Sequence, residues 1–360
     1  MKMTFTALSL LILLVAFVPP GFTQPNLQKI SPNTVDQADA IEVQTRGPIH
    51  EAFATPADSP PRPGLAVDKK PPEPIKEIPS DQKPNGENVQ WIPGYWAWDT
   101  DRNDYTWVSG FWRVPPQGRK WVPGHWTEAD GGWRWVTGFW APGAQEQVPY
   151  IDEAPPDSLD NGPSVPAPDD NSVYVPGNWA YKSNGYAWQP GFWSTAQPGY
   201  VWTPARYCWT PSGYVRVSGY WDYPLEDRGL LFAPVCFSSP LWTNPDWYYQ
   251  PSYCLPLGGL LNWLFCRPSW GCYYFGDYFG RGYYDQGFYP WFAYGTRFHD
   301  PLFGYYHWRN RENRGWDGGL ASDYRARGNG TLARPPRTLA QQNALASRFN
   351  NGGLTRGEFA

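Results

Sequence analysis

A six-residue motif that begins and ends with an aromatic residue recurs eight times along this chain of 360 residues. Most copies have Trp or Tyr first, Gly fourth and Trp or Tyr sixth, commonly with a β-branched residue second. The copies begin at residues 91, 107, 121 and 135, and again at 174, 188, 202 and 216. After a first spacing of 16 residues, the spacing within each group is 14, which marks a structural repeat. The fold must therefore contain one short structural element that is repeated eight times.

The residues in and between the motifs predict strands joined by turns. Trp, Tyr, Phe and Val favour strands, and the intervening clusters of Asp, Asn, Gly and Pro favour turns. One strand of about six to eight residues and one turn account for the period, so we expect a succession of antiparallel hairpins. The residue before Gly alternates Pro93, Ser109, Pro123, Thr137. Because Pro cannot donate to a sheet, the repeating unit is predicted to be two motifs long, about one hairpin.

The motif residues are predicted to have a structural role, with each Gly leaving room for a neighbouring ring to lie across the backbone. These residues are Trp91, Gly94, Trp96, Trp107, Gly110, Trp112, Trp121, Gly124, Trp126, Trp135, Gly138, Trp140, Gly177, Trp179, Trp188, Gly191, Trp193, Gly219 and Trp221. Two copies depart from the pattern, since Ala205 replaces Gly and Arg216 replaces the leading aromatic residue. We expect those two strands to pack differently.

The N-terminus is typical of a secretory signal peptide. Lys2 precedes an apolar run from Leu8 to Val18, and a Pro19-Pro20 break is followed by small residues up to Thr23. The alternative, an uncleaved anchor, needs an apolar run of roughly 20 residues. The sequence therefore predicts export to the periplasm, cell envelope or extracellular space. The mature chain is expected not to be an integral membrane protein.

The remaining composition predicts how the chain is divided. Prolines interleaved with charged residues between Pro56 and Pro84 predict a disordered spacer, and a second Pro-rich stretch is acidic. The predicted parts are a signal peptide at 1–23, a disordered Pro-rich spacer at 24–85, a first repeat block at 86–141, an acidic Pro-rich linker at 142–171, a second repeat block at 172–222, an aromatic-rich region at 223–310 and a basic, partly helical or disordered tail at 311–360.

The C-terminal part predicts irregular β structure with short helices. The 14-residue period is lost after the second block, although the chain remains aromatic. Asp300 precedes Pro301 as a cap and first-turn pair, and Thr338 stands three residues before Gln341 at capping-box spacing. We therefore expect short helices after Asp300 and after Thr338. The fold class is mainly β: antiparallel hairpin repeats in two blocks, an aromatic-rich irregular β C-terminal region, short C-terminal helices and a disordered Pro-rich N-terminal segment.

The five cysteines all follow the first repeat block. Cys266 and Cys272 flank a Pro/Gly turn and are the best candidates for a local disulfide in an exported chain. An odd number leaves at least one cysteine free or paired between molecules. Without a Cys-x-x-Cys pair or a Cys/His cluster, the sequence predicts no metal site of this kind.

The motif copies resemble those of the bacterial WxxGxW, or YxWGxW, repeat proteins, a family of exported proteins largely without assigned activity. The resemblance is clear over about residues 89 to 221, where the motif begins at Trp91, Trp107, Trp121 and Trp135 and in degenerate form later. It implies export and association with the cell envelope. It supplies no catalytic residues.

The search for reactive groups predicts that the chain is not an enzyme and needs no cofactor. His50-Glu51 lacks the second His of a zinc-protease motif, and nucleophile-elbow and phosphate-loop motifs are absent. The acidic run from Asp99 to Asp104 begins like a calcium loop but lacks the Gly and Glu that an EF-hand requires. A net charge of −4, or −5 once Lys2 is removed with the leader, does not suggest a nucleic-acid partner.

Aromatic rings outside the six-residue motif are the predicted binding residues. Rings on a sheet stack against flat apolar partners, and an exported aromatic sheet with few charges suits sugars. The candidates for glycan stacking are Trp98, Tyr105, Trp133, Tyr186 and Trp209. Two functions remain open: a non-catalytic envelope protein that binds polysaccharide through aromatic sheet faces, or a structural and assembly protein whose aromatic sheets contact other envelope proteins.

Overall fold

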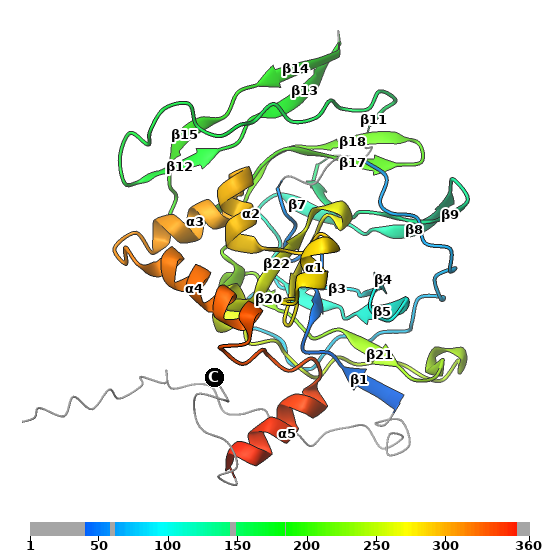
Figure 1. Ribbon diagram of the computed structural model, residues 1–360. Coiled ribbons are helices and arrows are strands. Elements are labelled where there is room, and N and C mark those ends of the chain that lie inside the picture. The colour runs from blue at the N-terminus through cyan, green and yellow to red at the C-terminus, as the bar shows by residue number, and fades with distance from the viewer. Residues whose placement is uncertain (1–39, 58–61, 145–148, 184, 351–360) are drawn as a thin grey trace, which may run out of the picture. The chain divides into compact units, whose positions relative to one another are not determined.

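Four long antiparallel hairpins form the repeat region, and each contains two motif copies (Figure 1). The computed structural model describes residues 40–57, 62–144, 149–183 and 185–350. The strands of hairpin 1 are β3 (Gln90–Ile92), β4 (Tyr95–Asp99), β5 (Asp104–Val108) and β6 (Phe111–Arg113), and those of hairpin 2 are β7 (Arg119–Val122), β8 (His125–Ala129), β9 (Gly132–Val136) and β10 (Phe139–Pro142). Hairpin 3 contains β12 (Ser172–Val175), β13 (Asn178–Lys182), β14 (Gly185–Gln189) and β15 (Phe192–Thr195), and hairpin 4 contains β16 (Val201–Thr203), β17 (Arg206–Thr210), β18 (Gly213–Val217) and β19 (Tyr220–Asp222).

Each hairpin is interrupted in its middle at the motif glycines. In hairpin 1, β3 pairs with β6 and β4 with β5, while the ladder is broken at Pro93-Gly94 and Ser109-Gly110. The break lets the two halves join different sheets. The half formed by β3 and β6, here called the inner half, pairs with β20 (Gly229–Leu230). The outer half, formed by β4 and β5, pairs with β21 (Val235–Phe237), which in turn pairs with β1 (Ile41–Val43). The predicted two-motif hairpin repeat is confirmed.

Motif aromatics face each other across the strands. Trp91 lies opposite Trp112 and Trp96 opposite Trp107, with ring centroids 5.3 and 5.2 Å apart in edge-to-face geometry. Hairpins 2 and 3 repeat the arrangement, and hairpin 4 keeps it in its inner half. Such pairs are worth about 0.5–1.5 kcal/mol each beyond the area that they bury. They give the repeat its stability without a continuous sheet.

The fourth motif position requires Gly because a ring from the partner motif lies on it. A Cβ atom at Gly138 would lie 2.5 Å from Cζ2 of Trp121, and one at Gly177 would lie 2.5 Å from Cζ2 of Trp188. In hairpin 4 the residue that would supply this ring to position 205 is Arg216, because it lies across from Tyr207 in the register. The two departures from the motif are therefore coupled: Ala205 is tolerated where the leading ring is replaced by an arginine.

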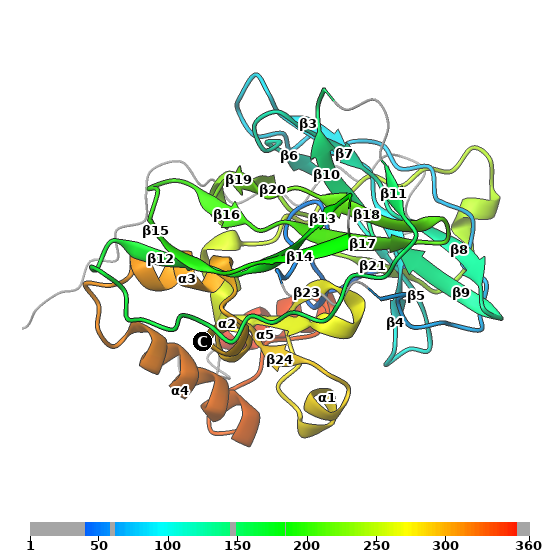
Figure 2. The ribbon, with the colours of Figure 1, turned by 90° about the horizontal axis from the view of Figure 1, so that it is seen from above.

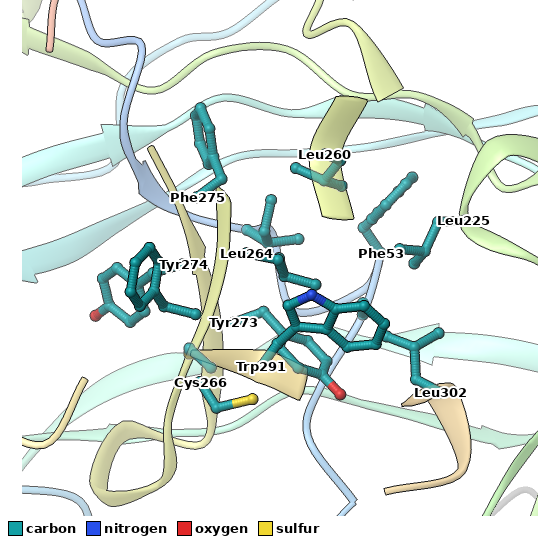
Figure 3. Packing of buried hydrophobic residues seen from close by; sticks show 14 of the residues in the cluster. Phe53, Leu225, Leu260, Leu264, Cys266, Tyr273, Tyr274, Phe275, Trp291 and Leu302 are labelled. Carbon is teal, nitrogen blue, oxygen red and sulfur yellow. The ribbon is translucent and has the colours of Figure 1, made fainter. Parts of the chain in front are cut away.

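The main core lies in the aromatic-rich region and takes residues from the N-terminal segment. Phe53, Leu264, Tyr273 and Trp291 are almost fully buried and pack together, as Figure 3 shows. Tyr273 and Tyr274 point to opposite sides of their strand in the same view. The strands here are β2 (Gly47–Pro48), β22 (Leu264–Arg267), β23 (Cys272–Phe275) and β24 (Tyr289–Pro290), in the order β2-β23-β22-β24.

Short helices follow in the C-terminal part of the described chain. They are α1 (Arg281–Asp285), α2 (Trp291–Phe298), α3 (Pro301–Arg309), α4 (Trp316–Asn329) and α5 (Leu339–Asn350). Asp300 caps α3 by accepting from the amide of Leu302, and the Thr338 hydroxyl accepts from the amide of Gln341 at the start of α5. Both predicted helices are confirmed. No helix of the described residues is long and apolar enough to cross a membrane.

The two repeat blocks pack on each other. Arg113 of hairpin 1 donates to both carboxylate oxygens of Asp222 of hairpin 4 at 2.7 Å, and both side chains are buried. A small core joins Phe139 of hairpin 2 to Val215 of hairpin 4. Figure 2 shows β13 and β14 running beside β17 and β18, where the Tyr207 hydroxyl donates to the carbonyl of Trp179.

The expected disorder of the N-terminal spacer is wrong for the part that the structure describes. Within residues 40–57 and 62–85, Ile49, Phe53 and Ile75 are buried, and β1 and β2 enter sheets. The linker at 142–171 also contains a strand, β11 (Tyr150–Ile151), which pairs with β18. The physical reason is that extended Pro-rich chain acquires partners from the hairpins. Residues 1–39, including the predicted signal peptide and cleavage site, and residues 58–61 lie outside the described residues.

The predicted disulfide does not form. Cys266 and Cys272 flank a turn as expected, but the register pairs Cys266 with Tyr273 and Cys272 with Arg267. Because neighbouring positions on a strand face opposite ways, the two sulfur atoms point to opposite sides of the ladder. Both cysteines are buried thiols, and burial raises the pKa of Cys272 to about 12.

Candidate functional site: carboxylates held at the hairpin glycines

Hairpin 1 holds the carboxylate of Glu77 at its central break. The amides of Gly94 and Gly110 donate to this carboxylate at 2.8 and 2.9 Å, and the indole Nε1 of Trp107 donates at 2.9 Å. The glycine amides are free for this role because the ladder is interrupted there. Two backbone donors and one indole donor thus form a ready-made site for one carboxylate.

Hairpin 2 holds Glu51 in the same way. The amide of Gly138 donates to Glu51 at 3.0 Å and Nε1 of Trp135 at 3.1 Å, and the amide of Gly124 also donates to it. Trp135 occupies the motif position of Trp107, and Glu51 is buried. Two hairpins of different sequence therefore present the same donors to one acid.

Hairpin 3 holds Asp160 with a related set of donors. The amide of Gly177 and the hydroxyl of Tyr174 both donate to Oδ2 of Asp160. Tyr174 leads the first motif of its hairpin, whereas Trp107 and Trp135 lead the second. The ring that donates to the acid therefore lies on the first motif in hairpin 3 and on the second motif in hairpins 1 and 2. Both arrangements are possible because the two motifs of a hairpin are related by an approximate twofold axis.

The chain that carries Glu77 or Asp160 runs along its hairpin without helix. The chain that carries Glu51 instead forms a turn, in which the amides of Phe53 and Ala54 donate to the carbonyl of His50. In all three cases, indole N–H groups donate to the backbone of this chain. On hairpin 1, Trp96 donates to the carbonyl of Glu73 at 3.0 Å and Trp112 to that of Ser80 at 2.9 Å. Proline lacks an amide, so Pro-rich chain offers carbonyls but few donors. We call these stretches docked segments; they are residues 73–80 on hairpin 1, residues 50–54 on hairpin 2 and residues 153–165 on hairpin 3.

The other two docked segments show the same recognition. Trp140 of hairpin 2 donates to the carbonyl of Ala52 at 3.1 Å. In hairpin 3, Trp179 donates to the carbonyl of Asp157 at 3.0 Å and Trp193 to that of Val165 at 2.9 Å. Hairpins 1, 2 and 3 therefore each bind a carboxylate at the centre and at least one backbone carbonyl beside it.

Burial makes two of these acids unusual. It raises the pKa of Glu77 to about 7 and that of Glu51 to about 7, and the hairpin N–H donors oppose the rise in both cases. The neighbouring His50 is buried as well, which lowers its pKa to about 3. The neutral His50 ring accepts from the amide of Ala52 through Nδ1. It therefore orders the docked segment without carrying charge.

Hairpin 4 departs from this arrangement. Within the described ranges, no carboxylate is bonded to the amides of Ala205 or Gly219. Arg119 instead donates to the carbonyl of Gly219 at 2.8 Å and lies over the ring of Tyr220. The motif copies that lost the Gly and the leading ring are those in which carboxylate recognition is missing.

The five candidate glycan-stacking residues do not form one platform. Trp98, Tyr105 and Trp133 belong to one cluster, in which Tyr105 is buried and donates to the carbonyl of Lys69. Tyr186 lies on hairpin 3 and donates to the carbonyl of Glu153. Trp209 stands apart, at the edge of a hollow beside hairpin 4. Of these candidates, Tyr186 contacts a docked segment, and Tyr105 contacts the chain that precedes another.

The acidic run from Asp99 to Asp104 accepts hydrogen bonds from other side chains of the same chain. Arg46 and the Tyr283 hydroxyl donate to Asp101, and Lys69 donates to Asp104. Among the residues that the structure describes, no three or more His, Cys, Asp or Glu side chains are grouped so as to hold a metal ion. Comparison with family models, curated proteins and solved structures finds no match to this chain.

Sequence reasoning missed the three acids at the hairpin centres. In the sequence, Glu51 belongs to an incomplete zinc motif, and Glu77 and Asp160 lie in a predicted spacer and a predicted linker. One signal is present: each acid has prolines nearby in the sequence and lies outside the repeat motifs. Their pairing with glycines 17 to 87 residues away is a tertiary feature that no local pattern reveals.

Proposed function

We propose that this chain is a non-catalytic assembly protein of the cell envelope whose WxxGxW hairpins bind acidic, proline-flanked segments that lack regular helix. The observation that carries the proposal is the recurrence of one arrangement in three hairpins: a carboxylate on the central glycine amides and indole N–H groups on backbone carbonyls nearby. Aromatic grooves that bind proline-rich chain use the same physics, since such chain loses little entropy on binding.

Hairpin 3 is the hairpin best suited to bind a partner. Its docked segment is largely exposed, with Leu159 55% and Val165 60% accessible, whereas Glu51 and its neighbours on hairpin 2 are buried. Beyond the carboxylate and the indole bonds, residues 153–165 accept from the Tyr186 hydroxyl at Glu153 and form an exposed ion pair between Asp157 and Arg62. A segment of the same chemistry from another envelope protein could therefore replace it at small cost.

A peptide experiment tests this function. A peptide covering residues 153–165 is immobilised, and binding of the full chain carrying Asp160→Asn is measured against that of wild type. We expect the variant to bind about tenfold more tightly, a difference of about 1.4 kcal/mol, because its own segment no longer holds the glycine amide as a carboxylate does.

The matched control is the peptide itself. Asp160→Asn in the peptide should weaken capture at least tenfold. Asp157→Asn should have little effect, because Asp157 contacts Trp179 through its backbone carbonyl and its carboxylate forms only an exposed ion pair with Arg62, which contributes little. Equal capture of the two altered peptides, or no capture of any peptide, would contradict the proposed function.

A further inference from the structure

A hollow between hairpin 2 and hairpin 4 brings together three indole rings and two arginines. Trp135 of β9, Trp209 of β17 and Trp270 of the 3-10 turn Pro268–Trp270 line it, together with Arg62 and Arg206. These residues come from four distant parts of the chain. The hollow adjoins the Glu51 site, because Trp135 and Arg206 border both, and it is distinct from the sites that hold Glu77 and Asp160.

The rings are held in place by contacts outside the hollow. Trp135 stacks on Tyr95 with centroids 4.7 Å apart and uses its Nε1 to bind Glu51. Trp270 lies beneath the guanidinium group of Arg267 at 5.4 Å. Trp209 is half-buried and belongs to none of the apolar clusters of the described residues. The packing of the described chain therefore does not account for Trp209.

Two unsatisfied features point to a ligand. The Nε1 atom of Trp270 is buried and has no hydrogen-bond partner among the described residues. Arg206 donates to the carbonyl of Gly138 at 3.4 Å and interacts electrostatically with the nearby Glu51, but within the described part of the chain no carboxylate forms a direct ion pair with it. Arg62 pairs with Asp157, but both side chains are exposed, and such a pair is easily exchanged for another carboxylate.

We propose that this hollow binds a uronic-acid unit of an anionic polysaccharide. Trp209 stacks on the apolar face of the sugar ring, as indoles do on flat partners. Arg206 binds the carboxylate of the sugar, with the bidentate geometry that guanidinium groups favour. The indole N–H of Trp270 donates to a ring hydroxyl. The arginines distinguish this ligand from a neutral glycan, and the indoles distinguish it from a simple anion.

The experiment measures binding to the full chain by isothermal titration with trigalacturonate, the neutral trisaccharide maltotriose and hexaglutamate as probes. We expect trigalacturonate to bind most tightly, and Trp209→Ala and Arg206→Gln each to weaken it about tenfold or more. Tyr284→Ala and Arg325→Gln, at exposed positions on α1 and α4, should leave it unchanged. Thermal unfolding of each variant verifies that it is folded.

Three outcomes would overturn the proposal. They are no binding of trigalacturonate by wild type, equal binding of hexaglutamate, which would assign the hollow to acidic peptides, and equal binding by the Trp209 and control variants. Because the proposed peptide function is tested at Asp160 on hairpin 3, the two proposals can fail independently.

Discussion

Replacing Gly110 by alanine is expected to lower the free energy of unfolding by about 3 kcal/mol or more. The new Cβ atom would overlap the Glu77 carboxylate, and it would lie 2.6 Å from the carbonyl oxygen of Ile92 and 2.7 Å from Cζ2 of Trp91. Two of these three obstacles are a backbone atom and a packed indole, which cannot move aside cheaply. The third is the bound acid, so the substitution combines overpacking with loss of a buried hydrogen-bonded group.

Urea denaturation of full-length variants measures this effect. Gly304→Ala is the matched control, because a Cβ atom at Gly304 in α3 meets nothing within 4 Å. It should leave stability unchanged or raise it slightly, since Ala favours a helix over Gly. If Gly110→Ala lowers the free energy of unfolding no more than Gly304→Ala does, packing of a ring against Gly110 is not the reason that this position requires glycine.

Glu77→Gln should remove a large part of the pH dependence of stability. The pKa of Glu77 is raised to about 7 in the folded chain, against an ordinary value of 4.5 for a glutamate side chain. The folded state therefore binds the proton more tightly, and stability from this group is full below about pH 4.5 and is lost as the pH rises through about 7. A shift of this size corresponds to about 3 kcal/mol.

The measurement is the free energy of unfolding at pH 4.5 and pH 8 for wild type and Glu77→Gln. His50 acts in the opposite direction, because its lowered pKa reduces stability as the pH falls below about 6.5. Glu51 acts in the same direction as Glu77. Both are present in each protein, so the difference between the two proteins isolates Glu77. An identical pH profile in the variant would show that Glu77 does not titrate in this range.

The parts of the fold that depend on local pattern could be predicted. Aromatic and β-branched residues around Gly94 and Gly110, with polar turns between the copies, indicate hairpins two motifs long. Asp300 and Thr338 cap helices as their spacing indicates. In these cases the decisive interactions join residues that are close in sequence or repeat at a fixed period.

The docked segments could not be predicted because their partners are remote. The stretch around Glu77 has too little apolar surface to order itself, which is why composition predicts disorder. Its order comes from Trp96, Trp107 and Trp112, whose indole N–H groups would otherwise lack partners. The predicted disulfide between Cys266 and Cys272 is wrong for another reason. The turn between them is predicted correctly, but the two cysteines are offset by one residue in the strand register, so their sulfur atoms lie on opposite faces.

Hydrogen exchange of the motif glycine amides tests the central claim most directly. In protein labelled with 15N-glycine, the amides of Gly94, Gly110 and Gly138 should exchange slowly, although none lies in a strand, because each donates to a carboxylate of the chain rather than to water. In Glu77→Ala, which removes both acceptor oxygens, the amides of Gly94 and Gly110 should lose protection, while Gly138, which binds Glu51, keeps it. Rapid exchange of all three in wild type, or unchanged protection of Gly94 and Gly110 in the variant, would contradict the account of WxxGxW hairpins as carboxylate-binding elements.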